Sequence, residues 1–164
     1  FTGLRIGVSA AKGLAWPDDK PCAGVSTLES MAWQLSGMEG IVCAAMDARR
    51  QQVYNALFEL KEGKPHRLTP DRAISLEELK LDLANVEKKQ IMVGDGAHLC
   101  YNAFQKCGYP VQMAPPHLQY QTAWGVARCA LEQARTGTLT DAAGLVPNYH
   151  RLSQAERERL AKQS

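Results

Sequence analysis

The sequence predicts an α/β layered fold, and two features of its pattern carry that prediction. Short apolar runs of strand length alternate along the chain with longer segments whose apolar residues recur at helical spacing. Several of the helical segments open on a serine that is followed three residues later by a glutamate, the capping-box spacing that marks a helix start. Strands that alternate with helices in this way are typical of a sheet with helices packed on it.

Residues 1–15 are predicted to form the first helix. Gly3, Gly7 and Ala11 are spaced four apart, so they share one helix face that lets another backbone approach closely. Glycine costs up to about 1 kcal/mol per residue inside a helix relative to alanine, so these glycines indicate a packing purpose. Spacing alone favours packing against the chain's own sheet, with a partner-binding site as the other interpretation.

The next elements are a short strand, a helix and a longer strand. A turn-rich break over 16–21 leads to a strand over 22–25, and Ser26 then opens a helix that runs to about residue 35. The continuous apolar run over 41–46 has strand length and predicts a buried central strand.

Residues 52–60 carry a set of apolar side chains at every second position, which predicts a strand. A turn at 62–65 separates this strand from a short one over 66–68. We expect the two to pair antiparallel at the edge of a mixed sheet. The apolar set of the first strand is Tyr54, Ala56, Phe58 and Leu60.

The second half of the chain continues the alternation. Ser75 opens a helix that carries Leu76, Leu79, Leu83 and Val86 on one face. The remaining expected elements are a strand over 91–93, a turn over 94–96, a helix over 97–106, a strand over 109–113, a helix over 123–135 with Thr122 as N-cap and Gly137 past its end, and a last helix over 154–162 opened by Ser153.

Composition narrows the class of protein. The chain has 164 residues, of which 45% are hydrophobic and 22% charged, so a substantial core is expected. Its longest apolar stretch is far shorter than a membrane span, which predicts a cytoplasmic protein. The net charge of +2 is too small to indicate a nucleic-acid surface, and the basic residues Arg151, Arg157, Arg159 and Lys162 are interpreted as a solvated helix face. Five cysteines without a C-x-x-C pair predict free thiols.

The sequence offers few candidates for chemistry. Gly94 and Gly96 flank an aspartate between a strand and a helix, which favours a tight turn over a phosphate site. His98 and Cys100 are two residues apart on a helix, so they do not face each other. Asp47 and Arg49 follow the central strand, where either an ion pair across a turn or a binding role is possible.

Three ordered segments resemble motifs of the TsaB family, also called YeaZ. The run Phe-Thr-Gly-Leu-Arg-Ile-Gly over residues 1–7 resembles the end of its glycine-rich signature. The run over 47–54 resembles its Asp-Ala-Arg segment, and residues 147–151 with 155–156 resemble its Pro-x-Tyr-Leu-Arg close. In that close His150 stands where leucine is usual, and we interpret Tyr149 as a domain-bridging residue and Arg151 as a structural one.

The resemblance implies the actin-like and sugar-kinase-like ATPase fold, with two ribonuclease-H-like lobes. Residues 1–36 would belong to a first lobe whose opening strands are missing, 40–115 to the second lobe, and 116–164 to C-terminal helices that return to the first. Members of this family begin with a strand-rich segment before the Phe-Thr-Gly motif, so we interpret the chain as N-terminally truncated. Its first lobe is then expected to be incomplete.

The resemblance also implies a function without a catalytic site. TsaB proteins are non-catalytic scaffolds or activating subunits in tRNA threonylcarbamoyladenosine synthesis. They pair with the transferase TsaD and recruit the ATPase TsaE, so tRNA would be reached only indirectly, and a homodimer is expected when the chain is alone. ATP and metal would reside on the partner subunit. The implied interface residues are Gly3, Leu4, Gly7, Val8, Ala11 and Ala15.

A metal centre in this chain is not expected. TsaD carries a His-Met-Glu-Gly-His segment whose register falls on residues 27–31, where Thr27 and Met31 replace both histidines. The four histidines of the chain are scattered. The alternative function is an autonomous enzyme, either a nucleotide-dependent transferase or a glycoprotease-like peptidase. A bare nucleic-acid module is a third class, against which the low charge and the 7% aromatic content argue.

Overall fold

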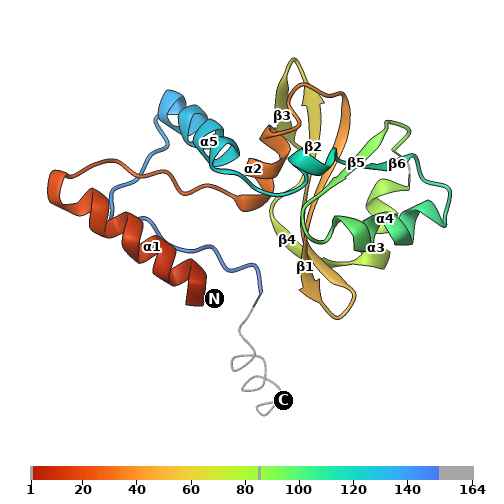
Figure 1. Ribbon diagram of the computed structural model, residues 1–164, viewed down its shortest axis with the longest axis horizontal. Helices are drawn as coiled ribbons and strands as arrows, with labels where there is room; N and C mark the ends of the chain where they lie inside the picture. The colour runs from red at the N-terminus through yellow and green to blue at the C-terminus, as the bar shows by residue number, and fades with distance from the viewer. Residues whose placement is uncertain (1, 85, 152–164) are drawn as a thin grey trace, which may run out of the picture.

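The computed structural model describes residues 2–84 and 86–151, and its centre is a mixed sheet (Figure 1). Within the described residues the sheet has six strands, in the order β3-β2-β1-β5-β6 with β4 paired to β2. The strands β1, β5 and β6 are parallel, whereas β2 is antiparallel to β1, β3 and β4. The bounds are β1 Gly40–Arg49, β2 Gln52–Lys61, β3 Lys64–Arg67, β4 Arg72–Ser75, β5 Gln90–Val93 and β6 Val111–Met113.

Helices cover both faces of this sheet, and one helix lies apart from it. Helix α2 packs on one face with α5 against it, while α3 and α4 lie on the other. Helix α1 lies to one side, along the chain segment 138–151. The bounds are α1 Thr2–Ala15, α2 Thr27–Trp33, α3 Leu76–Leu83, α4 Ala97–Gln105 and α5 Ala123–Thr136, with 3-10 turns η1 Trp16–Asp18 and η2 Pro116–Leu118.

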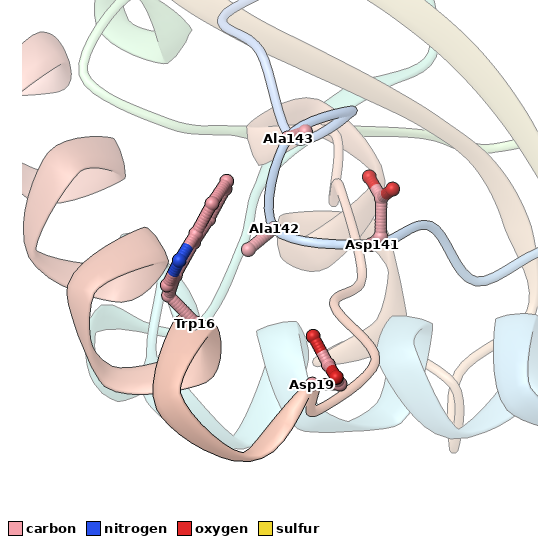
Figure 2. Close-up of a pocket in the computed structure, with 5 residues that line it drawn as sticks. All are labelled: Trp16, Asp19, Asp141, Ala142 and Ala143. Carbon is pink, nitrogen blue, oxygen red and sulfur yellow. The ribbon is translucent and has the colours of Figure 1, made fainter.

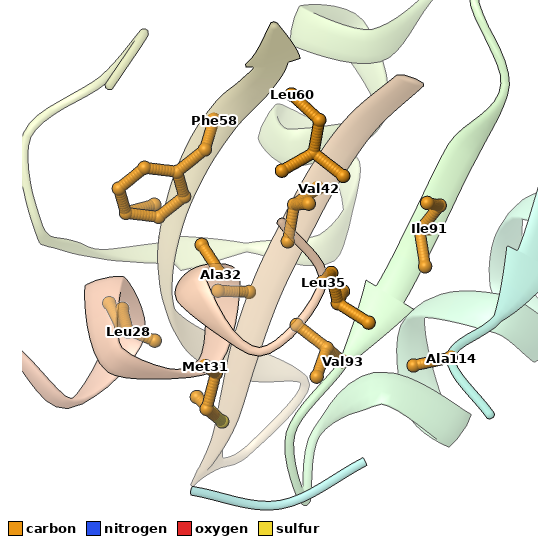
Figure 3. Packing of buried hydrophobic residues seen from close by; sticks show 12 residues of the cluster. Leu28, Met31, Ala32, Leu35, Val42, Phe58, Leu60, Ile91, Val93 and Ala114 are labelled. Carbon is orange, nitrogen blue, oxygen red and sulfur yellow. The ribbon is translucent and has the colours of Figure 1, made fainter. Parts of the chain in front are cut away.

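The central strand β1 explains why the sheet is buried on both sides. Its apolar residues alternate, with Val42 and Ala44 facing α2 and with Cys43 and Ala45 facing α3 and α4. Figure 3 shows the first of these cores, where Met31 and the rest of α2 cover the strands. The predicted buried central strand is thus confirmed. Neither core cluster contains a residue of α1.

The predicted helix caps explain where the helices begin. Ser75 and Glu78 form the complete capping box, and this contact holds the pKa of the Glu78 carboxyl below its ordinary value. Ser26 accepts from the N–H of Glu29 at 3.2 Å, but the Glu29 carboxylate bonds Arg67 at 2.8 Å instead of reaching back. Only half of that capping box therefore forms. The box expected at Ser153 and the helix over 154–162 lie outside the described residues.

The other helix and strand predictions hold with small changes at the ends. Thr122 caps α5, and Gly137 follows it in the left-handed conformation at φ 70°. The antiparallel pair of β2 and β3 forms as predicted, with β3 at the edge and β2 inside the sheet. The faces of β2 alternate as expected, and the one that includes Ala56, Phe58 and Leu60 packs into the core under α2.

Two predictions about strands were wrong. Residues 22–25 form no strand, because only Cys22 meets a partner, in a single bridge to Thr140. The segment Arg72–Ser75, which the sequence pattern did not mark, forms the short strand β4 along β2. The division into lobes at 1–36, 40–115 and 116–164 stays a prediction, and in the structure α2 shares a core with the sheet.

Candidate functional site

Helix α1 is held by its side chains rather than by a core. The Nε atom of Arg5 donates to the hydroxyl of Tyr149 at 3.0 Å, and the Nζ atom of Lys12 donates to the carbonyl of Ala143 at 3.1 Å. Both acceptors belong to the segment 138–151, which runs beside the helix in Figure 1. The position of α1 is therefore linked to that segment.

One face of α1 is turned toward the protein. Arg5, Val8, Lys12 and Ala15 are spaced by three or four residues and lie on one side of the helix. Val8 is half-buried, and Ala15 is buried with 6% of its surface exposed. Two of the expected interface residues thus lie on the inner side of α1, and Ala15 is not on the accessible surface.

The opposite face of α1 is open. Gly3, Leu4, Gly7 and Ala11 are exposed, and Leu4 keeps 50% of its surface. A Cβ atom built on Gly3 or Gly7 meets no other atom within 4 Å among the described residues. In this part of the chain, the small-residue face is not packed against the sheet, which spacing alone had favoured.

Two large apolar side chains on α1 were missed by the sequence analysis. Ile6 is 66% exposed and Leu14 is 78% exposed. With Ala10 between them they form a row at spacing four, beside the row of Gly3, Gly7 and Ala11. The signal was present in the sequence as this second row of four. The open face therefore combines small residues with bulky apolar ones, which is the composition of a surface that another molecule covers.

A small pocket lies at the C-terminal end of α1 (Figure 2). Its volume is about 120 Å³, and it is lined by Trp16, Asp19, Asp141, Ala142 and Ala143. One wall is fixed because Asp141 Oδ1 accepts from the N–H of Gly144 at 2.6 Å. Cofactor pockets typically measure roughly 300–1,000 Å³, so this one is too small for a nucleotide.

The turn after β1 is built by backbone contacts. Asp47 accepts from the N–H of Arg49 at 2.7 Å, and its own N–H donates to Asp95 Oδ1 at 3.1 Å. Arg49, Arg50 and Gln51 all have positive φ, between 55° and 63°. The expected ion pair between the side chains of Asp47 and Arg49 does not form within the described ranges. The carboxylate stabilises the turn through the backbone instead.

The turn between β5 and α4 has little capacity for a phosphate. The N–H of Gly94 donates to Gln119 O at 2.8 Å, and that of Gly96 donates to Ala45 O at 3.1 Å. Gly94 has a φ of 104°, and a Cβ there would lie 3.0 Å from the carbonyl carbon of Ala45. These glycines are required by the close approach of two backbones, as the tight-turn interpretation predicted.

Three of the five cysteines are buried in the fold. All five cysteines are free, and Cys43, Cys100 and Cys129 are buried. Burial raises the pKa of Cys129 to about 12, and contact with the Cys100 thiol together with burial raises the pKa of Cys43. His98 is exposed while Cys100 is fully buried, so the two form no dyad. The raised pKa values of Cys43 and Cys129 keep these two thiols protonated at neutral pH.

Within residues 2–84 and 86–151, no three His, Cys, Asp or Glu side chains gather closely enough to hold a metal ion. None of the helices found there combines the length and the apolar character needed to cross a bilayer. Thr27 and Met31 lie on α2, and Met31 is fully buried in the core beside the sheet.

The closing motif joins segments that are distant in the sequence. Arg151 donates from Nη1 to the carbonyl of Ala48 at 2.7 Å. His150 Nε2 lies 3.8 Å from Asp71 Oδ2, and Tyr149 accepts from Arg5. The structural role predicted for Arg151 agrees with this hydrogen bond, whereas the domain-bridging role of Tyr149 stays a prediction because it depends on the division into lobes. The first helix, the turn after β1 and the closing motif therefore meet in one region of the molecule.

Comparison with known proteins adds a family and a set of relatives. The family model described as "TsaD: tRNA N6-adenosine threonylcarbamoyltransferase" matches residues 1–158. The protein named tRNA threonylcarbamoyladenosine biosynthesis protein TsaB from Bacillus subtilis is 30% identical over 99% of this chain and 70% of its own length. The protein of the same name from Escherichia coli is 44% identical over 38% of this chain and 28% of its own length.

Solved structures show the same fold. A Pseudomonas aeruginosa protein described as similar to peptidase YeaZ superimposes with a TM-score of 0.74 over 92% of this chain and 68% of its own, at 21% identity. The structure titled YeaZ from Pseudomonas aeruginosa gives a TM-score of 0.70 over 91% of this chain and 68% of its own, at 20% identity. The mixed sheet with helices on both faces is the arrangement that these proteins share with the chain.

Proposed function

Because the chain belongs to the TsaB family, within the wider family described as tRNA N6-adenosine threonylcarbamoyltransferase, we propose that it acts in tRNA threonylcarbamoyladenosine biosynthesis. Its role there is that of a non-catalytic subunit, which pairs with a TsaD-like transferase and holds it in an active arrangement. The names of the relatives support the pathway. The geometry of α1 supports the role of a non-catalytic, partner-binding subunit.

The observation that carries this proposal is the open face of α1. Gly3 and Gly7 lack side chains and so leave a shallow groove on the helix surface, where a Cβ at either position would meet no other atom of the described residues within 4 Å. Leu4, Ile6 and Leu14 flank the groove and keep half or more of their surface exposed. Burying such side chains is favourable by roughly 1.5–3 kcal/mol each, which gives the face a reason to pair.

The chemistry of the remaining residues supports a role without catalysis. The amides of Gly94 and Gly96 are already bonded, and the buried thiols of Cys43 and Cys129 have raised pKa values, which disfavours the reactive thiolate. We therefore propose that ATP and metal are held by the transferase partner. Elemental analysis of the dialysed protein checks this, and about one zinc or iron per chain would contradict it.

Further partners follow from the same proposal. We expect a TsaE-like ATPase to join the pair and tRNA to be reached only through the partner. When the chain is alone, the open face of α1 is expected to pair with a second copy of itself. Because the substrate of the pathway is tRNA, we expect the chain to work in the cytoplasm.

A reconstituted reaction tests the role. Threonylcarbamoyladenosine in tRNA would be measured by mass spectrometry in three reactions, with the chain alone, with the transferase alone and with both, and the ATPase would be present in each. We expect product only in the reaction that contains both the chain and the transferase. Robust product from the chain alone would favour the autonomous transferase, and cleavage of peptide substrates by the chain alone would favour the peptidase.

Substitution within α1 then tests the face. Gly7→Leu places a bulky side chain in the groove, and overpacking of this kind costs about 1–3 kcal/mol, or a 5- to 150-fold loss of partner affinity. The fold should survive, since space around Gly7 is open. Gly37→Leu is the matched control, because Gly37 is equally open and exposed but lies in the turn after α2, away from α1. Equal losses in both variants would contradict pairing through this face.

A further inference from the structure

The position of α1 needs an explanation, because neither core cluster of the described residues includes any residue of this helix. The side-chain hydrogen bonds of Arg5 and Lys12 both go to the segment 138–151. The position of a surface helix that is held in this way depends on how firmly the segment 138–151 is itself fixed. The end of that segment, residues 149–151, is here called the closing strap.

The closing strap is anchored at Arg151. Its guanidinium donates to Ala48 O at 2.7 Å in a partly buried contact, and Ala48 itself is only 6% exposed. The backbone around Ala48 is fixed from both sides, because Asp47 bonds the N–H of Arg49 and donates its own N–H to Asp95. A charged donor on a rigid carbonyl is a strong point of attachment.

The middle of the strap meets a second organised group. His150 Nε2 lies 3.8 Å from Asp71 Oδ2. The same carboxylate bonds Arg67 at 2.5 Å and accepts from the hydroxyl of Ser26, the N-cap of α2, at 2.5 Å. Glu29, which bonds Arg67, completes the charged groups of this network. The strap is therefore linked to the start of α2 through Asp71, as well as to the end of β1 through Ala48.

The other end of the strap reaches α1. The hydroxyl of Tyr149 accepts from Arg5 Nε at 3.0 Å, and the guanidinium carbon of Arg5 lies 5.7 Å from the centre of the Tyr149 ring. Both a hydrogen bond and a cation–π contact thus connect the strap to the helix. Three consecutive residues contact α1, the network around Asp71 and the end of β1.

We propose that Tyr149, His150 and Arg151 are positioning residues for the partner-binding face. They fix α1 relative to the sheet before a partner binds. The entropy lost in ordering the helix therefore does not weaken the binding affinity. This inference rests on the proposed function in one respect only, because partner affinity is one of its two measurements. The other measurement, hydrogen exchange in α1, needs no partner.

The first experiment removes the anchor. Arg151→Met keeps the aliphatic stem and loses the guanidinium, and Arg135→Met, at an exposed ion pair on α5, is the matched control. Amide hydrogen exchange of α1, thermal unfolding and affinity for the transferase would be measured. We expect exchange in α1 to rise about tenfold and affinity to fall about tenfold, as the loss of one charge-assisted hydrogen bond predicts. Exchange in β1 and β2 should stay unchanged.

The second experiment tests whether the effect passes along the strap. Tyr149→Phe removes the hydroxyl that accepts from Arg5 and keeps the ring, so it should loosen α1 even if Arg151→Met fails to fold. If Tyr149 and Arg151 act through one another, the affinity of the double variant for the transferase is no more than about twofold lower than that of either single variant. Losses that multiply to about 100-fold, or exchange in α1 that matches the wild type in both single variants, would overturn the proposal. Wild-type protein that fails to bind the transferase would instead refute the proposed function and leave the exchange test intact.

Discussion

At the scale of single residues, burial decides which side chains can react. Cys129 lies where α5 meets α2, and burial raises the pKa of its thiol to about 12. Cys107 lies beyond the end of α4 and is exposed. The thiolate is the reactive form, so Cys129 is protected both by its burial and by its raised pKa, whereas the thiol of Cys107 is accessible.

This difference predicts the pattern of alkylation. With iodoacetamide at pH 8, we expect Cys107 to react fully and Cys22 partly, while Cys43, Cys100 and Cys129 stay unmodified until the chain is unfolded. A pKa of about 12 leaves roughly one thiol in ten thousand ionised at that pH. Peptide mass spectrometry, on protein alkylated with and without urea, measures the extent of modification at each cysteine. Rapid labelling of Cys129 in the folded protein would show that this face of α5 is not buried as described.

The roles of single residues were predictable where they depend on neighbours in the sequence. The box of Ser75 and Glu78 formed as its spacing predicts. The box at Ser26 formed only in half, because Arg67, distant in the sequence, binds the Glu29 carboxylate. Local spacing shows which contacts are possible. Which of them forms also depends on charged residues, such as Arg67, that the fold brings close.

At the scale of elements, two glycines on helices show opposite uses of the same residue. Gly125 lies where α5 crosses α2, and a Cβ there would lie 3.0 Å from the carbonyl carbon of Ser30 and even closer to its oxygen. Gly7 on α1 has open space around it. The first glycine permits close packing within the chain, whereas the second leaves a surface groove.

The two alanine variants should therefore move stability in opposite directions. Gly125→Ala forces α5 away from α2 and should lower the free energy of unfolding by roughly 1–3 kcal/mol. Gly7→Ala, its matched control, should raise it by up to about 1 kcal/mol through helix propensity. Urea unfolding followed by circular dichroism measures both. A Gly125→Ala variant as stable as the wild type would show that the helices are not packed as closely as described.

The elements that could be predicted from the sequence are those with a strong local pattern. The apolar run of β1 and the leucines of α3 fall into this group. The strand expected over 22–25 failed because its apolar residues had no partner strand, only the bridge at Cys22. Strand β4 was missed because its four residues follow no alternation and depend on pairing with β2.

At the scale of the whole molecule, the candidate site depends on contacts across long sequence distances. Arg5 and Tyr149 are 144 residues apart, and Ala48 and Arg151 are 103 apart. No periodicity or spacing reports such contacts, so the meeting of the three motif segments could not be predicted. The inner and outer faces of α1 were ambiguous for a related reason, since apolar residues surround most of the helix and only the fold assigns a side to each.

The separation of α1 from both cores predicts that the molecule tolerates its removal. A chain without residues 2–15 loses the hydrogen bonds of Arg5 and Lys12, at about 0.5–1.5 kcal/mol each, and the burial of Ala15. The sheet and its covering helices keep their contacts, so cooperative urea unfolding should persist with a stability lower by about 1–3 kcal/mol. Binding to the transferase, measured by calorimetry, should be lost, because the open face is gone. An unfolded product would show that α1 belongs to the core, and a folded product that still binds would show that the partner docks elsewhere.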